Sequence, residues 1–111
     1  MTLQTKLRTL YEPFLELDCE VYHYTRGSDT DVPYMVWAED GEQDSFETDN
    51  RKQEQQLSGL VDFFTLDEFD EICDDIQEIL NSEWIGWRLE SVQYEEETNL
   101  IHYQWRWWTV G

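Results

Sequence analysis

The chain has 111 residues, of which 40% are hydrophobic and 15% aromatic, so we expect one folded domain with its own core and not a disordered chain. Its charge is strongly unbalanced, because 26 acidic residues against 7 basic ones give a formal net charge of −19. A surface of this sign repels phosphates and anionic lipids, which argues against direct binding of nucleic acids or membranes through a basic face.

The first third of the chain predicts a helix followed by a strand. Leu3, Leu7, Leu10 and Phe14 are spaced by four, three and four residues, which predicts an amphipathic helix from Thr2 to about Glu12. Pro13 is expected to end or kink that helix. The β-forming run Cys19 to Tyr24 then predicts a short strand, and the polar residues around Gly27 predict a loop.

The middle of the chain predicts two strands separated by a long acidic loop. Pro33 to Ala38 reads as a strand that begins with a proline, and Asp40-Gly41 reads as the turn after it. The loop covers about residues 39–55 and is polar apart from Phe46, around which a short strand remains an option. Loops of this length in a compact domain are often functional. Leu57 to Phe64 is the next predicted strand.

The stretch Thr65 to Ser82 predicts the second helix, with Thr65 and Glu68 forming a capping box at its start. One face of this helix is apolar, and its residues are Phe69, Ile72, Cys73, Ile76, Ile79 and Leu80. The opposite face is acidic and carries no lysine or arginine; its residues are Asp67, Glu68, Asp70, Glu71, Asp74, Asp75 and Glu78. The apolar face therefore needs a partner layer within the fold.

The last third predicts an antiparallel hairpin, because Gly86 to Tyr94 and Leu100 to Val110 are joined by a short acidic link. Together these elements predict a single α+β domain over residues 1–111. Its expected architecture is a two-layer sandwich of about five mostly antiparallel strands with two helices on one face. The N-terminus does not resemble a signal peptide, so we expect cytoplasmic folding with Cys19 and Cys73 as buried free thiols, although one disulfide between them remains an option.

The sequence contains no pattern typical of catalysis or of a cofactor site. Carboxylates are so abundant that close pairs carry little information, and His23 and His102 each stand alone in a predicted strand. Asp40, Glu42 and Asp44 alternate like metal ligands, but they lack the glycine and glutamate that a calcium-binding EF-hand loop requires. We therefore expect a non-enzymatic protein without a cofactor or a dedicated metal site, although weak calcium or magnesium binding remains possible there.

The tryptophans are unusually concentrated, with five of six between residues 84 and 108. Along the last strand Trp105 and Trp107 point to one face, which we expect to be the core. Trp108 and Arg106 point to the opposite face. Tryptophan and arginine together are typical of interface anchors, so a subunit contact is expected there, with a sugar-binding platform as the weaker alternative.

Three phrases in the sequence resemble small tail-completion proteins of tailed phages and prophages, also called tail terminators or head-tail joining proteins. They are VPYMVWAEDG with the polar loop after it, FDEICDDIQEIL, and GWRLESVQYEEETNLIHYQWRW, and the resemblance covers roughly Val32 to Trp107. It implies a non-enzymatic ring, typically a hexamer, that caps the tail tube. The implied partners are other copies of the chain, the tail tube protein and a head-completion protein.

The same resemblance implies a location in the bacterial cytoplasm during assembly and then in the virion tail. It also implies that the loop makes ring or tube contacts, which adds Phe46, Arg51 and Lys52 to Trp108 and Arg106 as candidate contact residues. An isolated subunit of such a ring can stay monomeric until a tube templates it.

Two interpretations of the acidic surface remain open. An acidic ring channel would repel DNA phosphates and keep a sliding duplex centred. The alternative function is that of a small acidic decoy, which mimics DNA and blocks a basic host nucleic-acid-binding protein. The residues that could line a channel are Asp40, Glu42, Asp44, Asp70, Asp74, Asp75 and Glu78.

Overall fold

The computed structural model describes residues 2–27, 31–42, 47–48, 51–52 and 55–110, with the backbone alone at 47–48 and 51–52. The elements in chain order are α1 (Leu3–Tyr11), the 3₁₀ helix η1 (Glu12–Glu16), β1 (Glu20–His23), β2 (Tyr34–Glu42), β3 (Glu47–Thr48), β4 (Arg51–Lys52), β5 (Leu57–Thr65), α2 (Glu71–Leu80), β6 (Ile85–Glu95) and β7 (Leu100–Thr109). The predicted strands and helices are therefore present, with changed bounds.

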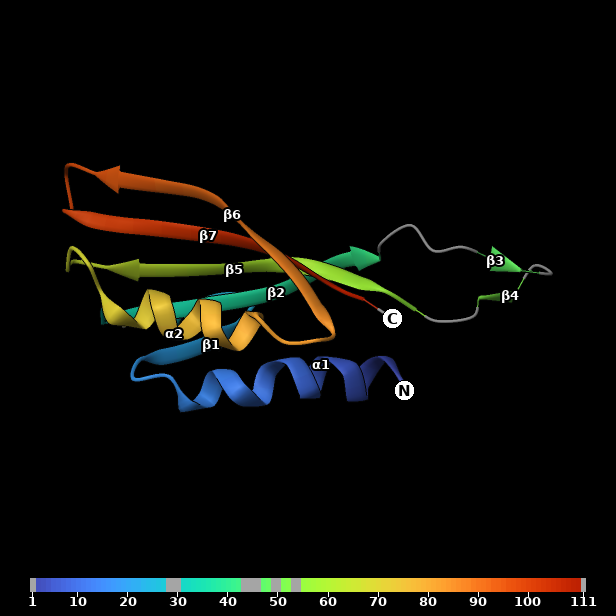
Figure 1. Cartoon of the computed structure of the whole chain (residues 1–111). Helices are drawn as coiled ribbons and strands as arrows, with labels where there is room; N and C mark the ends of the chain where they lie inside the picture. The colour runs from blue at the N-terminus through green and yellow to red at the C-terminus, as the bar shows by residue number, and fades with distance from the viewer. Residues whose placement is uncertain (1, 28–30, 43–46, 49–50, 53–54, 111) are drawn as a thin grey trace.

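Five strands form one open sheet in the order β1-β2-β5-β7-β6. β1 pairs with β2 in parallel, whereas the other three pairs are antiparallel. Side chains of α1, η1 and α2 share one core with side chains from a single face of the sheet, and Figure 1 shows the helices on that side. The predicted α+β fold, with about five mostly antiparallel strands and two helices on one face, is confirmed.

The core lies between this face of the sheet and the helices. β5 alternates strictly, with Val61 and Phe63 fully buried, and the buried aromatic residues of β7 are Trp105 and Trp107, as predicted. Phe14 from η1 and Ile76 from α2 close the core from the helix side, and both are fully buried. Burying a large apolar side chain stabilises the fold by about 1.5–3 kcal/mol, so these residues supply much of the stability.

The N-terminal helix begins at a hydrogen-bonded cap and ends close to the predicted proline. The Thr2 side chain accepts a hydrogen bond from the backbone N–H of Thr5 at 3.2 Å. The α-helix ends at Tyr11, and the chain continues through Pro13 as η1. A proline is tolerated in the first turn of a helix, so Pro13 changes the helix type without ending the helical path.

The second helix begins at Glu71, so the predicted start at Thr65 with a Thr65–Glu68 capping box is wrong. Thr65 is the last residue of β5, and its hydroxyl donates to Asp70 at 2.7 Å. Asp70 is the N-cap, because its other carboxylate oxygen accepts from the backbone N–H of Ile72 at 2.9 Å. Aspartate is the stronger N-cap of the two residue types, and the backbone of Thr65 already belongs to the pairing of β5 with β7.

The late helix start places Phe69 outside the helix, where it is 92% exposed and not on the apolar face as predicted. Its φ angle is 59°, which is a strained conformation for a large side chain. The rest of the predicted apolar face is confirmed, because Ile76 and Leu80 are buried and Ile72, Cys73 and Ile79 pack against the core. The turn between β5 and α2 therefore holds one aromatic side chain out in the solvent.

Removing the cap tests this helix start. Asp70→Ala is expected to lower the free energy of unfolding by about 1 kcal/mol, because the amide of Ile72 loses its acceptor. Urea denaturation followed by circular dichroism measures the change. Asp75→Ala is the matched control, since Asp75 is exposed and its side chain forms no hydrogen bond or ion pair within the described chain. An equal loss in both variants would contradict the cap assignment.

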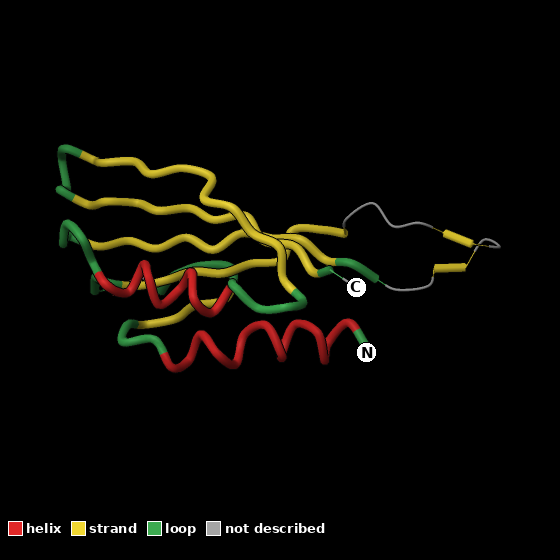
Figure 2. Tube along the Cα trace, in the orientation of Figure 1, coloured by secondary structure: helices red, strands yellow, loops and turns green. Residues whose placement is uncertain are grey.

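The predicted turn at Asp40-Gly41 is also wrong, because β2 continues through both residues to Glu42. The pairing of β2 with β5 shifts register between Glu39 and Gly41, so Asp40 lies at an irregularity inside the strand. The predicted loop thus loses its first four residues, 39–42, to β2. Beyond the main sheet, β3 and β4 pair with each other as a separate two-stranded sheet (Figure 2).

The C-terminal hairpin is confirmed. β6 and β7 pair along their whole length, with a register shift between Leu89 and Ser91. The turn closes where the backbone N–H of Asn99 donates to the carbonyl of Glu95 at 2.8 Å, and Asn99 has a φ of 61°. Asparagine tolerates this left-handed conformation better than most residues, which explains its position at the turn.

Candidate interaction surface

The sheet has a second face that points away from both helices, and we call it the helix-free face. Its residues alternate with those of the core along each strand. They are Glu20 and Tyr22 on β1, Tyr34, Val36, Ala38 and Asp40 on β2, Ser58, Leu60, Asp62 and Phe64 on β5, Leu100, His102, Gln104, Arg106 and Trp108 on β7, and Gly86, Arg88, Ser91, Gln93 and Glu95 on β6. The predicted contact residues Trp108 and Arg106 therefore lie where expected, on the face opposite the core.

One end of the helix-free face is a row of stacked rings. Tyr34 stacks on Phe64 with centroids 4.7 Å apart, and Phe64 stacks on His102 at 4.2 Å. Tyr22 of β1 meets Tyr34 edge-on at 6.3 Å. Arg26 lies over the Tyr34 ring, with its guanidinium carbon 5.7 Å from the centroid. Four neighbouring strands thus present a rigid aromatic row without any helix above it.

The next row along the strands is polar. Asp62 on β5 accepts a hydrogen bond from the side-chain amide of Gln104 at 2.9 Å, and the same oxygen lies 2.7 Å from Nε2 of His102. All three side chains are partly buried. His102 lies in β7 and His23 is the last residue of β1, so both histidines lie in strands, as predicted. This arrangement satisfies Asp62 within the sheet and holds the His102 ring against Phe64.

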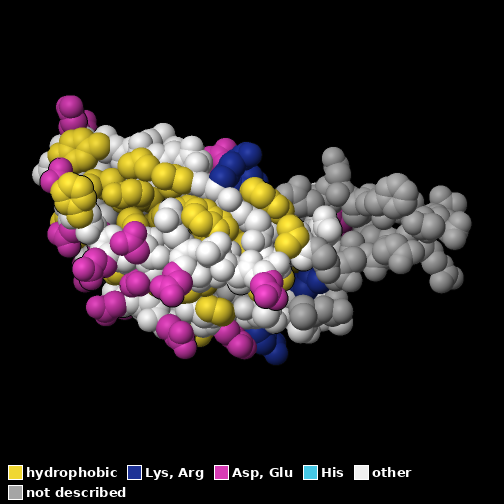
Figure 3. All heavy atoms as spheres, in the orientation of Figure 1, with side chains coloured by type: hydrophobic (Ala, Val, Ile, Leu, Met, Phe, Trp, Pro, Cys, Tyr) yellow, Lys and Arg dark blue, Asp and Glu magenta, His cyan; other side chains and the backbone are white. Residues whose placement is uncertain are grey.

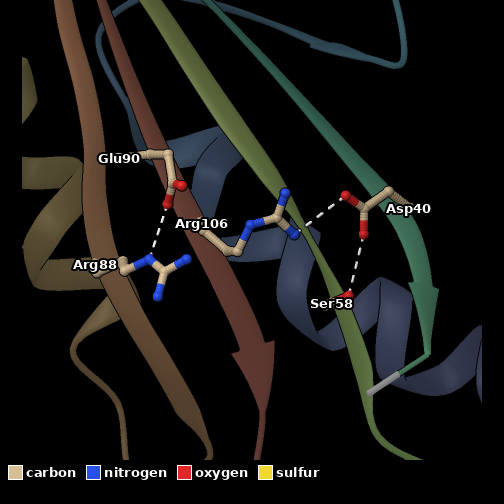
Figure 4. Close-up of polar contacts among 5 residues, drawn as sticks. All are labelled: Asp40, Ser58, Arg88, Glu90 and Arg106. Atoms are coloured by element: carbon tan, nitrogen blue, oxygen red, sulfur yellow. Dashed lines mark hydrogen bonds and ion pairs between the residues drawn. The ribbon is translucent and has the colours of Figure 1, made fainter. Parts of the chain in front are cut away.

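The third row carries the two arginines of the face. Arg106 and Arg88 are directly opposite each other on β7 and β6, and each has its own carboxylate (Figure 4). Nη1 of Arg106 lies 3.2 Å from Asp40, which also accepts from the Ser58 hydroxyl at 3.1 Å. Nε of Arg88 lies 2.8 Å from Glu90, and this hydrogen bond lowers the pKa of Glu90 and raises that of Arg88. Because each arginine has its own carboxylate, the two positive charges can lie side by side on neighbouring strands.

Trp108 lies at the end of this face against β6. It pairs with Gly86, and a Cβ atom built on Gly86 would lie 2.2 Å from Nε1 of Trp108. Only glycine therefore allows the indole to lie this close to the β6 backbone. Trp108 is half-buried as a result, so one side of the ring packs within the chain and the other remains available to a partner.

The structure separates the predicted acidic residues into three environments. Asp40 and Glu42 lie at the end of β2, where Asp40 is already paired with Arg106. Asp70 is the helix cap and not a free surface charge. Asp74, Asp75 and Glu78 are exposed on α2, on the opposite side of the sheet from Asp40. Asp44 and Phe46 lie outside the described residues, and Arg51 and Lys52 are described by the backbone of β4 alone.

An apolar strip on β6 was not predicted from the sequence. Leu89, Val92 and Tyr94 are 46%, 51% and 59% exposed on the helix side of the sheet. Figure 3 shows apolar side chains gathered above the helices, where β6 and β7 lie in Figure 1. The register shift between Leu89 and Ser91 breaks the two-residue alternation. Alternation along the sequence therefore does not predict this strip.

A small aromatic pocket lies between α1, the end of β1 and the middle of β2. It has a volume of about 310 Å³ and is lined by Gln4, Leu7, Arg8, Tyr11, His23 and Trp37. The His23 ring stacks on Trp37 at 3.8 Å, and Tyr11 stacks on the same indole at 5.7 Å. The sequence does not predict this pocket, because its residues come from three separate elements.

Within the described part of the chain, no cluster of three or more histidine, cysteine or acidic side chains could hold a metal ion. The helices described here are all too short or too polar to cross a lipid bilayer. No protein-family model matches the sequence, and no curated protein matches it. The function therefore has to be argued from the surfaces themselves.

Proposed function

We propose that the chain is a non-enzymatic structural subunit of a tailed phage or prophage. In this proposal copies of the chain form a ring, typically of six, that caps the tail tube and joins the tail to the head. The sequence resemblance over Val32 to Trp107 supports it. The observation that carries it is the helix-free face, a whole side of a five-stranded sheet with Trp108 and Arg106 over which no described helix or strand packs.

The edges of the sheet support the same proposal. β1 and β6 are the outer strands of the open sheet, and outer strands offer unpaired backbone groups to another chain. β6 also carries the exposed apolar strip Leu89, Val92 and Tyr94. In a subunit these surfaces would be covered by a neighbour, the tail tube protein or the head-completion protein. The subunit would assemble in the bacterial cytoplasm and remain in the virion tail.

The charge fits a ring through which DNA passes. The exposed carboxylates of α2 and Asp40 at the end of β2 lie on opposite sides of the sheet, so one of these surfaces can line the channel while the other faces outward. A lining of this sign repels phosphates and lets the duplex slide. A ring structure with both surfaces on the outside would exclude this role for the charge.

Light scattering across a range of salt concentrations, with and without purified tail tubes, tests the proposal. High salt screens the repulsion between chains of charge −19, so it should favour assembly. We expect either a discrete ring or a monomer that adds to tube ends. A monomer that ignores tubes at every salt concentration would contradict the proposal.

One observation favours the alternative of an acidic decoy. Asp74, Asp75 and Glu78 line the exposed side of α2, and within the described residues none of them is paired with a basic side chain. Such a row of free carboxylates could imitate phosphates. A decoy should bind basic host proteins with steep salt dependence and should ignore tail tubes, so the same tube experiment separates the two functions.

A further inference from the structure

Phe69 is the most exposed large apolar side chain among the described residues, at 92%. It lies in the turn Leu66 to Asp70, with carboxylates directly before and after it. The turn is fixed on both sides, because the Thr65 hydroxyl accepts from the backbone N–H of Asp67 at 3.1 Å and donates to Asp70 at 2.7 Å. The chain holds Phe69 at a φ of 59°, and strained residues cluster at functional sites.

The aromatic pocket beside α1 offers complementary chemistry. Its walls are the rings of Tyr11, His23 and Trp37 with Leu7, which suit an aromatic side chain. Its rim carries Arg8, whose side chain forms no ion pair or hydrogen bond within the described residues. Lys6, Arg26, Arg88 and Arg106 all have hydrogen-bond partners.

Within the described residues, the carboxylates near Arg8 form no ion pair with it. Glu39 is held by His23 at 2.8 Å and by the hydroxyl of Tyr24. Glu12 lies one helical turn after Arg8 and forms no ion pair with it. The pocket therefore combines an aromatic cavity with a free positive charge, in a chain that is otherwise acidic.

We infer that Phe69 of one copy of this chain docks in the α1 pocket of the next copy, with the carboxylate of the neighbouring Glu68 facing Arg8. The inference rests on the proposed ring function and identifies one subunit contact in addition to the helix-free face. Phe69 does not fill the pocket of its own chain, since it is almost fully exposed and does not line it. Two different surfaces thus meet head to tail, which is the kind of contact that closes into a ring.

Disulfide trapping between two variants tests the contact. Leu66→Cys and Gln4→Cys are mixed and oxidised. Leu66 is exposed in the same turn, so this variant keeps the Phe69 ring, and Gln4 is exposed on α1 and lines the pocket. The control mixture replaces Gln4→Cys with Thr9→Cys, which is exposed on the same helix but does not line the pocket. We expect the 66–4 disulfide to exceed the 66–9 disulfide about tenfold, because docking raises the effective concentration of the thiols. Equal yields would overturn the inference.

A charge exchange provides the second test. Arg8→Glu in the Gln4→Cys chain should reduce the 66–4 yield to the level of the control. Adding Glu68→Arg to the Leu66→Cys chain should then restore it, since the two charges have changed places. An Arg8→Glu chain that still gives the full yield would show that Arg8 does not face the acidic turn and would overturn the proposed contact.

One further variant distinguishes failure of the Phe69 contact from failure of the proposed ring function. Phe69→Asn removes the ring of Phe69, and asparagine tolerates a positive φ, so the turn should persist. If this variant still assembles on tubes as the unaltered chain does, and the 66–4 disulfide is not enriched, the ring function stands and the Phe69 contact is overturned. If the unaltered chain ignores tubes but the 66–4 disulfide is enriched, the contact stands and the ring function fails.

Discussion

Trp107→Ala is expected to lower the free energy of unfolding by about 3–5 kcal/mol, the usual cost of removing a buried tryptophan. Trp107 is fully buried, and a Cβ atom on Gly59 would lie 2.4 Å from its ring, so the indole packs directly on the β5 backbone. Single domains are typically stable by only about 5–15 kcal/mol, so this substitution should leave the chain marginally folded. Urea denaturation measures the loss.

The neighbouring Trp108 provides a matched control, because it is the same residue type on the opposite face of the same strand. Trp108→Ala should cost about 1 kcal/mol, since its ring is only partly buried and mainly the packing on Gly86 is lost. Trp107→Phe is a second control. The indole N–H of Trp107 has no hydrogen-bond partner among the described residues, so phenylalanine loses ring volume but no hydrogen bond. Equal losses from Trp107→Ala and Trp108→Ala would contradict the assignment of the two faces.

Trp108→Ala should have a larger effect on assembly than on stability. Trp108→Ala is expected to stay folded but to lose ring formation or addition to tube ends, because interface anchors are commonly tryptophan. Light scattering with tail tubes detects that loss. Normal assembly by Trp108→Ala would assign the subunit contacts to other surfaces, such as the β6 strip.

The fold could be predicted because its signals are local and periodic. Alternation along β5 and β7 separates core from surface, so Trp105 and Trp107 could be assigned to the core correctly. The spacing of Ile72, Ile76 and Leu80 likewise predicts the buried side of α2. These patterns depend only on the two-residue repeat of strands and the 3.6-residue repeat of helices.

The helix start could not be predicted by the same reasoning, because Thr65 and Asp70 both suit the N-cap position. The choice depends on how far β5 extends, and that is set by its pairing with β7, where Thr65 is opposite Ile101. Tertiary pairing therefore moved the cap by five residues and exposed Phe69. The turn signal at Asp40-Gly41 failed for the same reason, since pairing with β5 carries β2 through it.

The candidate surfaces were only partly predictable. The side on which Trp108 and Arg106 lie follows from alternation, but the ion pair of Arg106 with Asp40 joins residues 66 positions apart. The α1 pocket and the exposed β6 strip depend on where the helices lie across the sheet and on the register shift after Leu89. Such features arise from packing between distant elements and leave no short pattern in the sequence.

The two native thiols are expected to react far more slowly in the folded chain than in the unfolded chain. Burial, reinforced by the charge of Asp70, raises the pKa of Cys19 from 9.0 to about 11 and that of Cys73 from 9.0 to about 12. Because the thiolate is the reactive form, alkylation at pH 8 should slow about 100-fold at Cys19 and about 1000-fold at Cys73. Iodoacetamide labelling with and without urea, followed by mass spectrometry, measures both rates.

The same shifts give stability a direction with pH. The folded chain keeps the thiol protons above pH 9, where the unfolded chain releases them, so this contribution to stability is present below pH 9 and declines as pH rises toward 11 to 12. Labelling of the folded chain at the rate of the unfolded chain would contradict the raised pKa values. Slow labelling has a practical consequence, since exposed cysteines introduced at positions 66 and 4 would then oxidise selectively. The disulfide that reports the subunit contact can therefore be read in a chain that retains both native cysteines.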